Sequence, residues 1–361
     1  MEPTPEQITS REFVLTPADA LRAQMASLFT AAGVRAEEAA IAADILVTAD
    51  LRGVDTHGVI TGLRYVEQLA SGFIRADAEV RTLNEFPGGA VLSNDGGLGV
   101  VGAYRAMEAA IAHAKITGIG HAGIVDGRHI GMAGYYPMMA ARQDMIGLAV
   151  TNANAAVRPT GGTQARFGTN PIAFAAPAGS ERPFVLDMAT STVANGKVSL
   201  ARSLGLPIPR GWAVDAKGDP LEEAPAGRGA GWALTPLGET ASDEGANFKG
   251  YGLAIMVDVL AGVLFGGGTS VAMSYGHNMA WFMAIDIARI RPVEAFKADM
   301  DDLIRYLHET PRADENTPVR VAGDPEADAF ERRSRDGVPV HHGVLEQLRA
   351  KAAAAGVPAL V

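Results

Sequence analysis

The stretch Asp50-Leu51-Arg52-Gly53-Val54-Asp55-Thr56-His57-Gly58-Val59 carries the most reactive combination of side chains in this chain. Histidine titrates near neutral pH, so it can donate or accept a proton during turnover. A neighbouring threonine hydroxyl can fix the tautomer of the imidazole or relay its proton. A purely structural role is also open, in which Thr56 caps the next helix and His57 pins a helix end. The rest of the chain must decide between the two interpretations.

The residues before this stretch predict two helices within 16–50. Thr16 is expected to cap the first helix, with Pro17 at its first position and Asp19 in its first turn. An apolar stripe at helical spacing follows: Leu21, Met25, Leu28 and Phe29. The Thr56-His57 pair therefore lies just beyond a helical hairpin. Such element boundaries are common places for reactive groups.

Beyond about residue 88 the pattern changes to short apolar runs that alternate with helical periodicity, which predicts an α/β core. The expected strands are 90–93, 123–125, 146–151, 172–175, 184–188 and 281–286. The expected helices are 100–117, 133–143, 250–265, 293–307 and 344–355, and the last is expected to return to the N-terminal helices. Glycine, proline and charged residues predict a surface excursion at 202–247, and 311–339 has a similar character.

Composition excludes several functions. The 361 residues are 48% hydrophobic, enough to bury a large core, and the net charge of −10 with no basic cluster argues against nucleic acid as a partner. The chain has no cysteine, which excludes disulfides, thiolate catalysis and cysteine-bound metals, and which fits the cytoplasm best. The apolar segment 251–268 contains Asp258 and ends in glycines, so we predict a buried helix and no membrane span.

The segment Gly97-Leu98-Gly99-Val100-Val101-Gly102 matches G-x-G-x-x-G between an expected strand and an expected helix, and Asp126 follows it at a suitable distance. Such a motif can be a dinucleotide fingerprint. However, Ser93-Asn94-Asp95 stands where a tight buried turn is expected. A glycine-rich helix entry without a ligand therefore remains an equal alternative.

Further polar groups occupy expected turns and strand ends. His129 is flanked by Gly127 and Gly131, and glycines permit close approach of a flat ligand. The turn 167–171 and the strand end 187–191 carry hydroxyl, amide and carboxylate groups, and Asn195-Gly196-Lys197 adds a positive charge. Taken singly, His129 could be a structural histidine and Lys197 a surface lysine. The other histidines show no metal-ligand spacing, so we predict no metal site, and no G-x-S-x-G elbow occurs.

Together these segments resemble the malate/L-lactate dehydrogenase family that is distinct from the Rossmann-fold dehydrogenases. Members include ureidoglycolate dehydrogenase, sulfolactate dehydrogenase, diketogulonate reductase and reductases of piperideine-2-carboxylate. The resemblance covers nearly the whole chain in order, at 50–59, 95–115, 129–136, 168–171, 187–197, 249–264 and 276–286. Several long motifs in register are more specific than any single one.

The resemblance implies a family-specific α/β fold without a Rossmann unit, in which a mixed or antiparallel sheet accompanies a helical subdomain built from both termini. It implies a homodimer that uses NAD or NADP, the choice not being resolved. We expect an N-terminal helical subdomain with the proton relay at 1–87. A cofactor and substrate core is expected at 88–290, and a C-terminal helical segment at 291–361 is expected to pack on the first part.

The resemblance also assigns roles to individual positions. Thr56 and His57 match the proton-relay pair of the family. His129 matches a histidine at the cofactor and substrate that is the proton acceptor in some members, and Lys197 matches a polar catalytic partner. The matching substrate contacts are Thr169, Asn195 and Gly196; the matching cofactor contacts are His129, Asp187, Met188, Ala189, Gly323, Asp324, Pro325 and Glu326.

Two positions depart from the pattern. Thr56 replaces the usual serine, a mild change, whereas Thr61 stands where many members have an arginine that binds the substrate carboxylate. Threonine cannot bind a carboxylate through two hydrogen bonds as arginine does. We therefore expect an atypical substrate, or compensation by Arg64 or Arg158.

The expected function is NAD(P)-dependent interconversion of a 2-hydroxy acid and a 2-oxo acid, with a small molecule as partner. Two alternatives remain open. One is reduction of a cyclic or open-chain imine, such as a cyclic imino acid. The other is a nucleotide-binding protein that has lost turnover.

Overall fold

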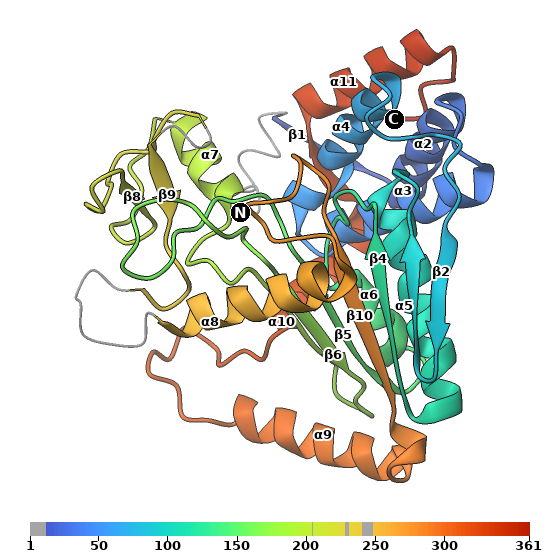
Figure 1. Cartoon of the computed structure of the whole chain (residues 1–361), viewed down its shortest axis with the longest axis vertical. Coiled ribbons are helices and arrows are strands. Elements are labelled where there is room, and N and C mark those ends of the chain that lie inside the picture. Colours follow the sequence, from blue (N-terminus) through green and yellow to red (C-terminus); the bar gives the residue numbers. More distant parts are fainter. Residues whose placement is uncertain (1–11, 204, 228–230, 240–247) are drawn as a thin grey trace.

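The computed structural model describes residues 12–203, 205–227, 231–239 and 248–361. A seven-stranded sheet with the order β2-β3-β4-β10-β5-β6-β7 forms its centre (Figure 1). The strands are β2 (Arg81–Phe86), β3 (Gly89–Ser93), β4 (Ile119–Val125), β5 (Met145–Thr151), β6 (Ile172–Ala176), β7 (Phe184–Met188) and β10 (Ala280–Asp286). In this sheet β3 and β4 pair in parallel and every other neighbouring pair is antiparallel.

This topology confirms the expected non-Rossmann fold, because a Rossmann unit requires a mostly parallel sheet. The single parallel pair is joined by α5 (Gly99–Thr117), which packs on β3, β4 and β10. Next to it, α6 (Tyr135–Ala141) packs on β5 and β6. The strands of the centre are apolar on the faces that these helices cover, and this contact forms the main buried core.

The two chain ends form a helical group beside the sheet (Figure 1). Its elements are α2 (Ala18–Ala31), α3 (Ala36–Leu51), α4 (Val59–Ala70), α10 (Asp324–Asp336) and α11 (His342–Ala355). The short strands β1 (Phe13–Thr16) and β11 (Val338–His341) pair antiparallel and tie the ends together. In addition, α11 packs on α2 and α4, and α10 packs on α3. The expectation that the last helix returns to the N-terminal helices is confirmed.

Some local predictions were wrong. Thr16 does not cap the first helix: it ends β1 and donates its hydroxyl to Val14 O, while Pro17 occupies the cap position. The segment 311–339 is not irregular throughout, since it contains α10. That helix buries only Ala329 and Arg333, so it lacks the apolar stripe by which helices are recognised. The expected helix 250–265 is instead α8 (Phe248–Val257) followed by a π turn and a 3₁₀ turn.

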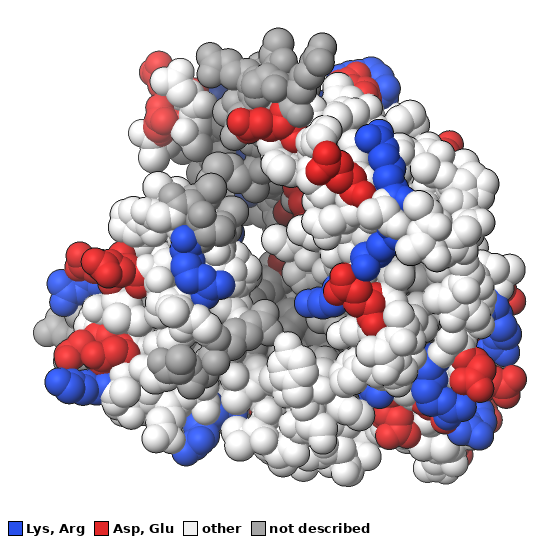
Figure 2. Space-filling view, turned by 90° about the horizontal axis from the view of Figure 1, so that it is seen from above, with Lys and Arg blue, Asp and Glu red and all other residues white. Residues whose placement is uncertain are grey.

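A separate lobe follows β7. It contains α7 (Asn195–Ser203) and a small sheet of β8 (Ala213–Asp215) and β9 (Trp232–Leu234), around a cluster of Val157, Val193, Val198 and Leu234. The expected excursion at 202–247 belongs to this lobe, although 204, 228–230 and 240–247 lie outside the described residues. The space-filling view shows a hollow between the lobe and the body of the molecule (Figure 2). Beyond the sheet, α9 (Val293–His308) lies at its far end.

Candidate functional site

The Thr56-His57 pair lies in a 3₁₀ turn, Asp55–His57, between α3 and α4. Thr56 Oγ1 is 2.9 Å from His57 Nδ1. Gly58, and not Thr56, is the residue that precedes α4, so the capping interpretation of Thr56 is wrong. Beneath the turn, the buried Asp50 carboxylate accepts the Val59 N–H at 2.8 Å. A Cβ on Gly58 would collide with this carboxylate, which explains the glycine.

The second imidazole lies against the first. The rings of His57 and His129 are stacked, with centroids 5.4 Å apart and planes inclined by 24°. The Tyr65 hydroxyl lies 2.7 Å from His129 Nδ1 and 3.0 Å from His129 O. Tyr65 is only 1% exposed, whereas Thr56 is exposed. One imidazole is therefore bonded to a hydroxyl at the surface and the other to a buried hydroxyl.

The glycine motif at 97–102 positions His129. A Cβ on Gly99 would lie 2.4 Å from Arg128 O and 2.5 Å from His129 O, so this glycine lets the loop with His129 pass close to the start of α5. Cβ atoms on Gly97 and Gly102 would meet Ala78 and Asn94. The glycines pack against protein, so the motif is a helix entry and not a dinucleotide fingerprint.

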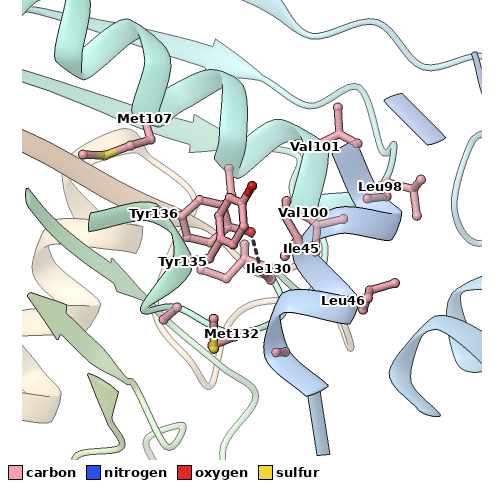
Figure 3. Close-up of a cluster of buried hydrophobic side chains, with 14 of the residues drawn as sticks. Ile45, Leu46, Leu98, Val100, Val101, Met107, Ile130, Met132, Tyr135 and Tyr136 are labelled. Carbon is pink, nitrogen blue, oxygen red and sulfur yellow. Dashed lines mark hydrogen bonds between the residues drawn. The ribbon is translucent and has the colours of Figure 1, made fainter. Parts of the chain in front are cut away.

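Apolar neighbours anchor the same loop. Ile130 and Met132 are buried between α3 and the start of α5, and Tyr136 donates its hydroxyl to Ile130 O at 2.5 Å (Figure 3). Arg128 donates to Phe73 O and Gly127 O. His129 therefore projects from a loop that is held on both sides, which suits a group that must keep a fixed position.

The surroundings make His57 a weak base. Burial, and secondarily the charge of Arg64, lowers the pKa of His57 to about 4, so its imidazole is neutral at pH 7. Burial raises the pKa of Tyr65 above its usual value, so its phenol stays protonated. An anion that pairs with Arg64 would offset the Arg64 charge and so raise the pKa of His57.

The start of α7 faces the Thr56-His57 turn. A Cβ on Gly196 would lie 3.8 Å from Thr56 Cγ2, so the lobe and the helical group meet at this point. Asn195 precedes it and is partly buried, whereas Lys197 follows it and is exposed. Thr169 lies in the turn before β6, and its carbonyl accepts the Thr190 N–H at 2.9 Å. This bond joins the Thr169 turn to the strand end after β7.

Most of the predicted cofactor residues lie at the end of β7 and at the start of α10. Asp187 accepts the Gly134 N–H at 2.6 Å, and a Cβ on Gly134 would lie 2.9 Å from the same carboxylate. Burial raises the pKa of Asp187 to about 6, although part of its side chain remains accessible. The Glu326 charge also raises this pKa, and the Arg52 charge lowers it. Val185 N donates to Ala322 O at 3.1 Å, which places the loop with Gly323 beside β7.

The other cofactor candidates differ in their exposure. Met188 ends β7 and Ala189 follows it, both partly buried. Pro325 is exposed in the first turn of α10. The Asp324 carboxylate is already bonded to His308 Nε2 at 2.7 Å and to Val321 N at 2.8 Å. Asp324 therefore fixes the start of α10. Glu326, in the same helical turn, is the carboxylate whose charge raises the pKa of Asp187.

The three residues considered for binding the substrate carboxylate differ in their exposure and in their bonding partners. Thr61 is 5% exposed and donates its hydroxyl to Thr56 O at 2.9 Å, so it supports the relay turn from below. Arg158 pairs with Glu239 and donates to Gly162 O at 2.9 Å, which neutralises and occupies its guanidinium. Arg64 is exposed, lies 5.8 Å from the Tyr65 ring and forms no ion pair with any described residue. Arg64 also hydrogen-bonds the Tyr65 hydroxyl, and the remaining N–H groups of its exposed guanidinium can bind a ligand.

Tyr65 is the functional residue that sequence reasoning missed. It lies on α4 one helical turn after Thr61, and both side chains face inward from that helix. The spacing of 57, 61 and 65 could have revealed it, since residues four apart share one face of a helix. Among the described residues, no group of three or more His, Asp or Glu side chains is arranged to hold a metal.

Comparisons with known proteins agree with this geometry. The sequence profile described as malate/L-lactate dehydrogenase matches residues 16–349. Malate dehydrogenase of Pyrococcus horikoshii is 40% identical over 356 residues, 96% of this chain and 97% of that protein, and its solved structure has a TM-score of 0.85 over 96% and 97% of the two chains, at 38% identity.

Two further relatives carry different substrates in their names. L-sulfolactate dehydrogenase of Methanothermobacter thermautotrophicus is 35% identical over 89% of this chain and 91% of that protein. The structure of delta1-piperideine-2-carboxylate reductase from Pseudomonas syringae has a TM-score of 0.82 at 26% identity, over 94% and 100% of the two chains. This chain belongs to the malate/L-lactate dehydrogenase family and is an NAD(P)-dependent dehydrogenase or reductase.

Proposed function

We propose that the chain interconverts a 2-hydroxy acid and a 2-oxo acid in the cleft between the lobe and the body. The observation that carries this proposal is the stack of His57 and His129 near Arg64, an exposed arginine that has no ion pair with a described residue. It offers a proton-exchanging group and an anion-binding group in one place. The relatives named for malate and sulfolactate act on compounds of this class.

The residues beside β7 fit a nicotinamide dinucleotide. The accessible carboxylate of Asp187, which the Gly134 N–H holds in place, suits ribose hydroxyls, and the Arg52 guanidinium nearby suits phosphate. When bound, the nicotinamide supplies or accepts the hydride at C2 of the substrate. Turnover with NADH compared with NADPH distinguishes the two cofactors.

His57 exchanges the proton in this proposal. A group that exchanges protons in every turnover must communicate with solvent, and the exposed Thr56 hydroxyl provides that path to His57 Nδ1. His129 Nδ1 is bonded instead to the Tyr65 hydroxyl, whose residue is only 1% exposed. His57 therefore acts as the base in oxidation and the acid in reduction, and His129 holds the reacting oxygen or nitrogen of the substrate by a hydrogen bond.

Arg64 binds the substrate carboxylate in this proposal and takes the place of the arginine absent at position 61. Pairing with a carboxylate neutralises the charge that depresses the pKa of His57. Binding of an acidic substrate thus raises the pKa of His57 toward neutrality, where proton transfer is most efficient. Lys197, Thr169 and Asn195 complete the pocket by orienting the substrate oxygen.

A coupled absorbance assay of NADH and NADPH tests the function. We expect turnover with at least one 2-oxo acid in a panel that also contains cyclic imino acids and neutral ketones. Turnover with the imino acids alone would replace the proposal by imine reduction, the reaction in the name of the Pseudomonas syringae relative. Cofactor binding without turnover on any compound would identify a nucleotide-binding protein that has lost catalysis.

We also propose that the chain acts as a cytoplasmic homodimer through the segment from Phe248 to Phe265. This segment is the one stretch of the described chain that is long and apolar enough to cross a membrane, and only a third of it is buried. Val259, Val263 and Leu264 are each about half exposed or more. An apolar surface of this kind marks an interaction site.

Light scattering tests the dimer. Val259→Glu is expected to give monomers, and Leu303→Glu, which changes an equally exposed leucine on α9, is expected to leave the dimer intact. A monomeric parent protein, or a dimeric Val259→Glu variant, would refute this interface. Association of the parent with lipid vesicles would instead identify the segment as a membrane anchor.

A further inference from the structure

The relay turn is held by a residue from the far end of the chain. Arg333 of α10 donates to Asp50 O at 2.5 Å and to both oxygens of the Asp55 carboxylate, the second at 3.3 Å. Arg333 is 2% exposed, so its charge lies inside the protein. The Asp55 carboxylate and the Asp50 carbonyl help to stabilise this buried guanidinium, and the two-pronged contact fixes the direction of the Asp55 side chain.

Asp55 begins the turn that presents the reactive pair. Thr56 and His57 follow it directly, and Asp55 O accepts the Gly58 N–H at 3.2 Å, which closes the turn. Asp50 bonds the other side of the same turn through Val59 N. Arg333 therefore contacts the two residues that determine where the turn lies. Asp50 lies near the end of α3, and Asp55 is the first residue of the turn.

The helix that carries Arg333 also reaches the other half of the site. Its first turn contains Glu326, whose charge raises the pKa of Asp187, and Gly323 before it packs on Val185 of β7. Glu326 and Arg333 lie seven positions apart, about two helical turns on the same side. One rigid helix thus spans from the dinucleotide residues to the proton relay.

We propose that Arg333 is a positioning residue for the relay: through Asp55 and the carbonyl of Asp50 it holds Thr56 and His57 in the geometry that proton exchange requires. The proposal rests on the function proposed above for His57. The Thr56 hydroxyl reaches His57 Nδ1 over 2.9 Å. A displacement of about 1 Å would break that bond, and misplacements of this size can cost roughly a hundredfold in rate.

Two variants test the role. Arg333→Lys keeps the charge and loses the two-pronged contact, whereas Asp55→Asn, at a side chain that is 41% exposed, keeps an oxygen that can accept from Arg333 and removes the charge that balances it. The matched control is Arg335→Lys on the same helix, because Arg335 is 73% exposed and, among the described residues, its ion-pair partner is the neighbouring Asp336. Circular dichroism and the Tm identify the folded variants. Asp55→Asn decides the question if Arg333→Lys does not fold.

We expect both variants to lower kcat by about tenfold or more while the KM for the cofactor changes by less than about twofold. The double variant should lose no more activity than the more impaired of the two single variants, because the two residues act as one unit. A kcat within about twofold of the parent in the folded variants would refute the positioning role.

Hydrogen exchange gives a readout that needs no turnover. Peptides that cover 52–62 should exchange faster in Arg333→Lys and Asp55→Asn than in the parent, and at the parental rate in Arg335→Lys. Peptides from α5 should exchange at the parental rate in all three variants. Unchanged exchange at 52–62 in both variants would refute the proposal. A parent protein without turnover would refute the proposed function alone, since the exchange result would still report whether Arg333 holds the turn.

Discussion

Replacement of Arg64 by methionine separates the two effects that we assign to this residue. Methionine keeps much of the apolar length of the side chain and removes the guanidinium. Arg64 is exposed and has no ion pair with a described residue, and the buried Tyr65 hydroxyl that it also bonds keeps its hydrogen bonds to His129 when Arg64 is removed. We therefore expect no change in Tm, and any change in activity should come from the site itself.

The first effect concerns binding of the substrate carboxylate. A charge-assisted hydrogen bond contributes about 1.5–3 kcal/mol, and solvent screening of an exposed guanidinium favours the lower end. The KM for an acidic substrate should therefore rise by roughly tenfold. The KM for a neutral ketone of similar size, if it is turned over, should stay unchanged.

The second effect concerns the pKa of His57. Burial is the larger cause of its depression to about 4 and Arg64 is the smaller one, so removal of Arg64 should raise this pKa without restoring the usual value. In the oxidation direction His57 must be neutral, so kcat/KM falls as the pH drops below this pKa. The acid limb of the profile should thus move to higher pH in Arg64→Met.

The assay is the pH dependence of kcat/KM for oxidation of a 2-hydroxy acid, with the cofactor saturating. Arg312→Met, an exposed arginine in the loop before α10, is the matched control. An unchanged KM for the acid would refute the binding role of Arg64. An acid limb that stays in place, or moves to lower pH, would refute the electrostatic link to His57.

Three further predictions follow from the same geometry. His57→Gln and His129→Gln should each lower kcat by about a hundredfold or more with an unchanged Tm. A solvent isotope effect on kcat should disappear only in His57→Gln. Near-parental rates in either variant would remove that histidine from the mechanism. Gly99→Ala should lower kcat by up to about a hundredfold, because its Cβ would push on Arg128 O and His129 O. Gly343→Ala on α11, whose Cβ would make only ordinary contact with the His341 ring, should not; equal rates would refute the positioning by Gly99. Asp301 of α9 accepts hydrogen bonds from Ser180, Glu181 and Gly179, which hold its pKa well below the usual range. Its contribution to stability is present above about pH 4 and is lost as the pH falls further, so Asp301→Asn should lower the Tm at pH 7 and lower it less at pH 3; a constant difference would refute this reasoning.

Local sequence pattern predicted the elements that bury an apolar face. The strand Phe184–Met188 has the predicted bounds, and the helices at 99–117, 293–308 and 342–355 differ from the predicted ranges by one or two residues. Elements without such a face were missed, for a physical reason: periodicity records burial, and β2 is largely exposed while α10 is largely polar. The missed helix α10 is the one that carries Arg333.

The motifs likewise indicated which residues react but not how they are held. The glycines at 97–102 were open to two interpretations until the backbone of His129 was found against Gly99. Thr61 was expected at the substrate and instead supports the relay turn from below. Arg158 was a candidate for the substrate until its pairing with Glu239 was seen.

By itself the sequence determined the family, the kind of fold and the pair Thr56-His57, because these depend on residue types in order along the chain. The tertiary structure decided the partners: His129 stacked on His57, Tyr65 on His129, and Arg333 bonded to Asp55 across 278 positions of sequence. Hydrogen bonds and ion pairs act over a few ångströms in space. Residues far apart in the chain meet only through packing of the whole fold, so only the folded molecule shows which hydroxyl, carboxylate or guanidinium each reactive group finds.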